Sequence, residues 1–230
     1  MTIKQKLDLL DKIYGIYDTF ARDLEVACQK YCDHCCTSNV CLTTLEGYRL
    51  VHRLEPDQRE YLQRCLETTS GKRVFRPLLT TNRIADLCRK GREIPAEAFG
   101  DPAEDCPLLE ENACPVYRLR PFGCRCLVSR IPCRASGTAE MPDFVLTVNT
   151  VFLQTIEHLD AAGCTGNLAD VLRCLLPDDN RQAFRDGRLS CSATGLIGNH
   201  PLTVLMVPPE HRNRLQPILS ALGNLSIEPT

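Results

Sequence analysis

Cysteine constrains this chain more than any other feature of its sequence. Fifteen of the 230 residues are cysteine, and the odd count means that intramolecular disulfides cannot pair all of them. The N-terminal residues mix charged and apolar side chains without a continuous apolar stretch, so they predict no signal peptide. Disulfides are rare in the reducing cytosol, where a high cysteine content is typical of metal ligation. The sequence therefore predicts a cytoplasmic protein that binds metal through thiolates.

Composition excludes several other function classes. Lys and Arg number 27 against 29 Asp and Glu, so no overall positive field attracts nucleic acid or an anionic membrane. The apolar runs fall far short of the roughly 20 residues that span a bilayer. A chain of 230 residues can bury a core that is stable without disulfides or bound metal. We therefore expect one domain over residues 1–230 that contacts neither nucleic acid nor membrane and has a redox or protein partner.

Apolar residues recur at helical spacing through most of the chain. One such stripe runs along the first 31 residues and consists of Leu10, Ile13, Tyr17, Phe20, Leu24, Ala27 and Tyr31. Thr43 and Glu46 form a capping box at the start of a second helix, and Gly91 is placed to end a fourth. The predicted helices are 1–31, 43–54, 57–67, 81–90, 149–162, 168–176 and 210–222.

Little β structure is expected. Residues 106–117 carry two short apolar arms around a polar Glu-Glu-Asn turn, which predicts a small β-hairpin. Residues 202–207 predict a short strand or a buried extended run, and residues 91–105 predict a loop. The resulting fold is mainly α, an irregular helical domain with a small β-hairpin and a Cys-rich metal site. Residues 28–133 form the metal-binding region, and residues 140–230 form a helical extension of unknown role.

The cysteines that predict chemistry fall into two groups. The first group consists of Cys28, Cys32, Cys35 and Cys36, with Cys41 close behind. The second group consists of Cys106, Cys114, Cys124 and Cys126, with Cys133 seven residues on. A Cys-x2-Cys step is short enough for one loop to hold one metal or cluster. Only His34 lies inside a group, so we expect ligands that are all sulfur.

The number of grouped thiols allows several kinds of centre. Thiolates favour zinc, copper(I) and iron–sulfur clusters. The count fits two mononuclear sites, one multinuclear site, or one or two [4Fe–4S] clusters, and leaves open whether Cys41, Cys126 and Cys133 bind. We favour an iron–sulfur cluster, with zinc or iron ions as the alternative, because more thiolates are grouped than one structural zinc needs.

The residues around both groups form a longer pattern. The first group is followed by Leu42-Thr43-x-x-Glu46, and the second begins with Cys106-Pro107-Leu108. A Cys-Pro-Val-Tyr-x-x-Arg-Pro-x-x-Cys-Arg run then occupies residues 114–125. Over residues 28–126 this resembles the CxxCxxCC family of zinc- or iron-chelating domain proteins, apart from a gap of three residues between Cys28 and Cys32 instead of two. The resemblance implies a zinc or iron species bound by these cysteines.

Three functions remain after this comparison. We expect a metal-binding protein with a redox or electron-transfer role. A zinc-stabilised protein-interaction module is one alternative, and a metal-dependent modifying enzyme such as a lysine methylase-like protein is another. The resemblance suggests the last, because some proteins with this signature are associated with methylation of flagellin lysines. Those chains are longer, and a glycine-rich nucleotide fingerprint is missing from this sequence.

Several residues near the second group predict supporting roles. Arg120 and Arg125 flank Cys124, where guanidinium groups would donate hydrogen bonds to sulfur and offset thiolate charge. Tyr117 is expected to pack or hydrogen-bond against the site, and His34 to be an exposed loop residue. The isolated cysteines are expected to be small buried apolar residues: Cys65, Cys88, Cys164, Cys174 and Cys191.

Overall fold

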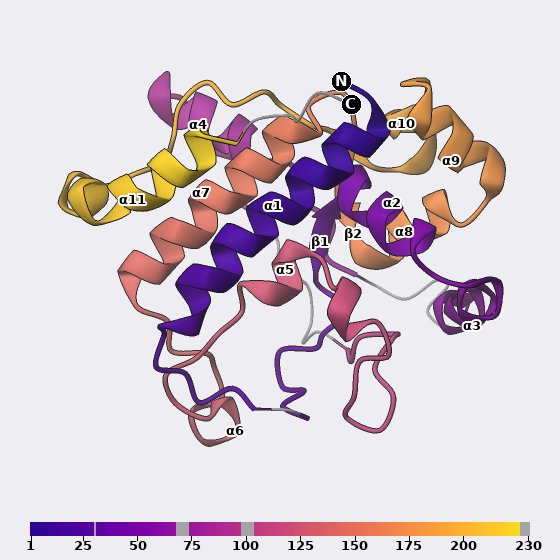
Figure 1. Cartoon of the computed structure of the whole chain (residues 1–230), viewed down its shortest axis with the longest axis horizontal. Coiled ribbons are helices and arrows are strands. Elements are labelled where there is room, and N and C mark those ends of the chain that lie inside the picture. Colours follow the sequence, from indigo (N-terminus) through magenta and orange to yellow (C-terminus); the bar gives the residue numbers. More distant parts are fainter. Residues whose placement is uncertain (30, 68–73, 98–103, 226–230) are drawn as a thin grey trace.

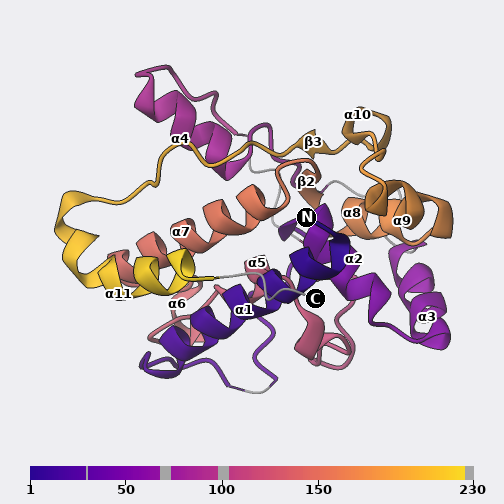
Figure 2. The same ribbon diagram turned by 45° about the horizontal axis from the view of Figure 1, so that its top comes forward.

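The computed structural model describes residues 1–29, 31–67, 74–97 and 104–225, and it confirms a mainly α chain. Its long elements surround a small antiparallel sheet (Figures 1 and 2). The helices are α1 (Ile3–Arg22), α2 (Thr44–His52), α3 (Pro56–Glu67), α4 (Thr81–Arg89), α5 (Phe122–Arg125), α6 (Cys133–Ser136), α7 (Asp143–Leu159), α8 (Leu168–Leu175), α9 (Asp178–Arg185), α10 (Cys191–Thr194) and α11 (Arg212–Gly223), with the short 3-10 helices η1 (Tyr117–Leu119) and η2 (Pro209–His211). The strands are β1 (Cys41–Thr43), β2 (Cys164–Asn167) and β3 (Ile197–Gly198).

Helix α1 is shorter than the stripe in its sequence predicts. It starts at a capping box on Thr2 and ends at Arg22, so the expectation of a helix to residue 31 is wrong. Beyond Arg22 the chain turns toward a distant segment, where the N–H of Ala27 donates to the carbonyl of Ser129 at 2.8 Å. Tyr31 has a φ of 68°, a left-handed value that an α-helix does not contain. Leu24, Ala27 and Tyr31 therefore lie in irregular structure.

Helices α1 and α7 lie side by side and hold the aromatic part of the core (Figure 1). The Tyr17 ring meets Phe122 and Phe152 edge-on, with centroids 4.8 Å and 5.1 Å apart. Its hydroxyl donates to Oδ1 of Asn149 on α7 at 2.8 Å. Phe122 belongs to α5, so this cluster also anchors the helix that carries Cys124. Buried apolar side chains continue without interruption from α1 to α11.

The regular sheet was not predicted from the sequence. Strand β1 pairs antiparallel with β2, with Leu42 opposite Gly166, and β2 pairs antiparallel with β3. Residues 202–207 do not join it and are irregular, with a bend at Val204. Gln154 on α7 bonds the backbone of Val204 and Met206. The hairpin predicted in residues 106–117 is reduced to one bridged pair, Glu110 with Ala113.

Some of the remaining helices follow their sequence signals. Thr43 caps α2 through the predicted box, since its N–H donates to Oε2 of Glu46 at 2.9 Å. Gly91 takes a φ of 61° just beyond α4, as a glycine that ends a helix does. Helix α7 begins at Asp143, six residues before the predicted start, and α9 was not predicted. Of the loop predicted over 91–105, residues 98–103 lie outside the described residues.

Cys164 and Cys191 form a disulfide, so the expectation of two isolated buried thiols is wrong. The β2–β3 pairing brings the start of α10 to the start of β2, and the N–H of Asn199 donates to the carbonyl of Gly163 at 3.0 Å. Of the other isolated cysteines, Cys174 is buried as expected and Cys65 is half-buried. Cys88 is exposed at the end of α4, so the expectation of a buried residue is wrong there. Across the described helices, none combines the length and the apolarity needed to cross a bilayer.

Candidate metal centre

Both cysteine-rich segments lie on one side of the molecule. The segment from the end of α1 to β1 and the segment from residue 104 through α5 to α6 meet below the long helices in Figure 1. The backbones are bonded directly, because the N–H of Cys106 donates to the carbonyl of Cys36 at 2.8 Å. The N–H of Ser38 donates to the carbonyl of Glu104 at 2.7 Å, and Thr37 forms a bridge with Asp105. This pairing places the end of the first group beside the start of the second.

Cys106 and Cys114 begin two equivalent turns. Each is followed by proline, and each carbonyl accepts a hydrogen bond from the N–H three residues on, at 2.9 Å for Cys106 and 3.1 Å for Cys114. Proline favours such turns because its φ is fixed at the value that their second position requires. Against the larger effect of burial, the backbone N–H two residues after each cysteine lowers the pKa of its thiol. Backbone donors of this kind stabilise thiolates and tune the metal sites that thiolates form.

A tight turn joins these two Cys-Pro turns. Glu110 and Ala113 exchange hydrogen bonds of 2.9 Å and 2.7 Å across it. Between them, Glu111 and Asn112 have φ values of 47° and 63°. Two successive left-handed residues are the signature of a type I′ turn, which reverses the chain within two residues. The segment therefore returns Cys114 to the side on which Cys106 lies.

Helix α5 positions Cys124. The helix begins at Phe122, whose N–H donates to Oε1 of the buried Glu46 at 2.7 Å. Gly123 lies so close to β1 that a Cβ there would be 2.8 Å from the carbonyl oxygen of Cys41. Glycine at this position thus lets α5 approach the strand, and the approach brings Cys124 to the other thiols.

The thiols of the second group and Cys36 affect one another electrostatically. A hydrogen bond from Cys35 lowers the pKa of Cys36, while the thiols of Cys106, Cys124 and Cys114 oppose this effect. Burial, followed by the thiols of Cys106 and Cys114, raises the pKa of Cys124 well above its usual range. Such mutual effects require proximity, so the fold brings Cys36, Cys106, Cys114 and Cys124 into one neighbourhood.

Arg120 supplies positive charge to this neighbourhood. Against the larger effect of burial, it lowers the pKa of both Cys114 and Cys124. Its guanidinium carbon lies 4.0 Å from the centroid of the Tyr117 ring, which is 57% exposed. Its Nε is buried and has no hydrogen-bond partner in the described part of the chain. Arg120 therefore acts on the thiols of Cys114 and Cys124, and Tyr117 contacts Arg120.

Arg125 is directed toward α1 rather than toward the thiols. Its Nη1 lies 3.3 Å from a carboxylate oxygen of Asp18, and its guanidinium carbon is 4.5 Å from the Tyr14 ring centroid. It also donates to the carbonyls of Arg118 and Arg120, at 3.2 Å and 3.1 Å. Arg125 thus fixes the backbone on which Arg120 lies, and its guanidinium contacts α1 and this loop.

The remaining cysteines of the two groups, and His34, differ from one another in their surroundings. Cys28 and the exposed Cys32 belong to the loop that contacts α6. Cys126 is buried beside the second group, with its sulfur 3.7 Å from the carbonyl oxygen of Gly123. Burial raises its pKa to about 12, and its thiol in turn raises the pKa of Cys124. Burial, followed by the carboxylates of Glu97 and Asp170, raises the pKa of Cys41 to about 12. His34 is exposed, as expected, with Nε2 3.3 Å from the carbonyl oxygen of Gly137.

The donor chemistry fits a thiophilic metal, because many thiols, backbone N–H groups and one guanidinium share this region. The arrangement is open: within the described residues, no three His, Cys, Asp or Glu side chains are placed closely enough to share an ion. The cysteines that meet here are on loops, turns and one four-residue helix. Closure around an ion therefore requires movement of these short elements.

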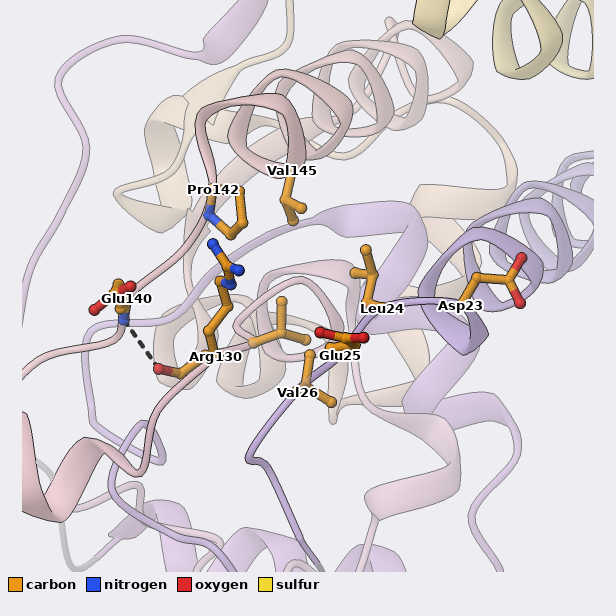
Figure 3. A pocket seen from close by; sticks show the side chains of 10 residues that line it. Asp23, Leu24, Glu25, Val26, Arg130, Glu140, Pro142 and Val145 are labelled. Carbon is orange, nitrogen blue, oxygen red and sulfur yellow. Dashed lines mark hydrogen bonds between the residues drawn. The ribbon is translucent and has the colours of Figure 1, made fainter.

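A surface pocket lies next to the Cys28 loop (Figure 3). It has a volume of about 270 Å³ between the end of α1, residues 128–130 and the start of α7. Leu24, Val128 and Val145 supply apolar walls, while Glu25 and Arg130 are among the charged residues that line it. The N–H of Glu140 donates to Oγ of Ser129 at 2.9 Å, as Figure 3 shows. The carbonyl of Ser129 accepts from the N–H of Ala27, next to Cys28, so the pocket and this loop share a wall.

Comparisons of this chain with protein-family models, with curated proteins and with solved structures give no match. The cysteine pattern and the geometry around it are therefore the grounds on which a function is proposed.

Proposed function

We propose that this chain binds a thiophilic metal centre through its two cysteine groups and uses it in electron transfer. The observation that carries the proposal is the 2.8 Å hydrogen bond from the N–H of Cys106 to the carbonyl of Cys36. It joins cysteine groups that are about 70 residues apart in the sequence. A fold that brings separate groups of free thiols together is suited to metal binding, because idle neighbouring thiols oxidise easily.

An iron–sulfur cluster is the favoured centre, and zinc or iron ions are the alternative. The backbone donors at Cys106 and Cys114 are of the kind that stabilises cluster and metal thiolates. Arg120 adds a positive charge, which favours the reduced, more negative state of a cluster and so raises its reduction potential. The number of thiols exceeds what one structural zinc takes.

The experiment is metal and acid-labile sulfide analysis of the full chain purified without oxygen, with its visible spectrum. We expect iron and sulfide in near-equal amounts and a brown absorbance that bleaches on reduction. Cys124→Ser should lose at least half of the metal, whereas Cys174→Ser, a buried cysteine on α8, should keep all of it. Zinc without sulfide would show that the centre is a zinc site and not an iron–sulfur cluster. Wild-type protein without any bound metal would overturn the proposal.

A further inference from the structure

The loop that carries Cys28, Cys32 and Cys35 docks on a different element from Cys36. The N–H of Ala27 donates to the carbonyl of Ser129 at 2.8 Å. Asp33 forms an ion pair of 2.8 Å with Arg134. His34 Nε2 lies 3.3 Å from the carbonyl oxygen of Gly137. These three contacts hold the loop against α6 and the residues before and after it.

Helix α6 presents a cysteine at this contact. Cys133 is its first residue and is 6% exposed, so its thiol is turned inward. The carbonyl of Ser129, four residues before Cys133, accepts the hydrogen bond from Ala27, the residue next to Cys28. Burial raises the pKa of Cys28, and the thiols that raise it further are those of Cys32, Cys35 and Cys133. Cys28 therefore has its own set of thiol neighbours.

Cys36 has a separate set. Apart from its partner Cys35, the thiols that act on Cys36 are Cys106, Cys124 and Cys114. The two sets meet at the adjacent residues Cys35 and Cys36, where the chain turns with the N–H of Cys36 donating to the carbonyl of Asp33 at 2.7 Å. Downstream of this turn the chain pairs with residues 104–106, and upstream of it the chain contacts residues 129–137.

We infer that the chain holds two separate four-thiolate metal sites, one formed by Cys28, Cys32, Cys35 and Cys133 and the other by Cys36, Cys106, Cys114 and Cys124. This inference rests on the proposed function and divides its cysteines between two centres. Four thiolates complete either a tetrahedral zinc site or the ligand set of one [4Fe–4S] cluster. The division adds Cys133 to the ligands and leaves out Cys126, whose sulfur is buried against the carbonyl of Gly123.

Each site would fix a different contact in the fold. The first would tie the segment after α1 to α6, where Ala27, Asp33 and His34 already make contacts. The second would tie the residues before β1 to the two Cys-Pro turns and α5. Because the sites share no ligand, removing one thiol should empty one site and leave the other loaded.

The test is an anaerobic cobalt(II) titration of the reduced, metal-free full chain, followed by sulfur-to-cobalt charge-transfer absorbance and native mass spectrometry. We expect two cobalt ions on the wild type, one on Cys32→Ser, one on Cys133→Ser and one on Cys114→Ser. The double variant Cys32→Ser/Cys114→Ser should bind none. Cys32 is exposed, so its substitution keeps the test valid if Cys133→Ser fails to fold. Cys88→Ser, exposed on α4, is the matched control and should bind two.

Amide hydrogen exchange locates the lost site. In Cys32→Ser, cobalt should no longer protect residues 128–137 but should still protect residues 106–119, and Cys114→Ser should show the reverse. A wild type that binds one cobalt, or single variants that all bind none, would overturn the two-site inference and leave the proposed function standing. Two ions on both Cys32→Ser and Cys133→Ser would overturn the first site. A wild type that binds no cobalt would count against the proposed function itself.

Discussion

Glu46 holds the N-terminus of α5 through a 2.7 Å hydrogen bond from the N–H of Phe122 to its Oε1. The same oxygen accepts from the hydroxyl of Tyr14 at 2.8 Å, and Oε2 accepts from the N–H and the hydroxyl of Thr43. This buried carboxylate therefore receives four hydrogen bonds from α1, α5 and the start of α2. Through Phe122 it also sets the place of Cys124.

Glu46→Gln should destabilise the fold and weaken metal binding. Glutamine has one acceptor oxygen and one NH2 group. The NH2 group would face either the two donors of Thr43 or the donors of Tyr14 and Phe122, and the donors that it faces would have no acceptor. A buried unsatisfied donor costs about 1–3 kcal/mol. Urea unfolding should show this loss, and metal analysis should show lower occupancy. The control is Glu60→Gln, an exposed residue paired with Arg64, which should change stability by less than about 0.5 kcal/mol.

Gly123→Ala should disturb the site through packing alone. The added Cβ would lie 2.8 Å from the carbonyl oxygen of Cys41, so α5 must shift away from β1. Overpacking of this kind costs about 1–3 kcal/mol. Gly15→Ala is the matched control, because no atom lies within 4 Å of its added Cβ, and in the middle of α1 it should stabilise the protein by about 0.5–1 kcal/mol. Equal thermal stabilities of the two variants would contradict the close approach seen at Gly123.

Arg120→Gln should weaken metal binding without unfolding the protein. The variant loses the positive charge that lowers the pKa of Cys114 and Cys124, so their thiols release protons to a metal less readily. Substitutions next to metal ligands commonly reduce affinity by about 10- to 100-fold. A competition titration with a chelator at several pH values would measure the loss, which should grow as the pH falls. Arg118→Gln, at an exposed position in the same run, should bind as the wild type does.

Asp160 should make stability fall with rising pH. Burial raises its pKa to about 7, and its Oδ1 has no hydrogen-bond partner among the described residues. Between about pH 4 and pH 7 the folded protein therefore keeps a proton that the unfolded chain has released. Each such proton lowers the free energy of unfolding by up to about 1.4 kcal/mol per pH unit.

Asp160→Asn removes this titration. The free energy of unfolding of the variant relative to the wild type should rise between pH 4 and pH 7 and level off above pH 7. Urea unfolding of both proteins across this range checks the expectation. Parallel curves would show that Asp160 is ionised in the folded protein throughout.

Local signals account for the parts of the fold that the sequence analysis predicted. The capping box of Thr43 and Glu46 and the left-handed Gly91 depend on neighbours within a few residues, so the sequence contains them. The sheet, by contrast, depends on residues that are far apart in the sequence. Strand β1 is three residues long and pairs with residues more than 120 positions away, so it carries no periodicity to detect. The disulfide of Cys164 with Cys191 depends on this sheet and was missed with it.

In the candidate metal centre, too, local features were predictable from the sequence and long-range contacts were not. Spacing and residue type grouped the cysteines and indicated Arg120 as a source of charge. The direction of Arg125 was not predictable, because the Asp18 and Tyr14 that it meets lie more than 100 residues earlier on α1. The association of Cys133 with the Cys28 loop likewise arises from contacts of residues 27–34 with residues 129–137, which only the folded chain reveals.

The long separation of the paired cysteine segments has a consequence for biosynthesis. Cys36 is synthesised well before Cys106, and Cys28 is synthesised 105 residues before Cys133. At about 5–20 residues per second, the early thiols remain without their partners for roughly 4–20 s. During this time the vicinal pair Cys35 and Cys36 is open to oxidation and to incorrect metals. The nascent chain should therefore acquire its metal late, and its yield in cells should depend on how reducing the compartment is during translation.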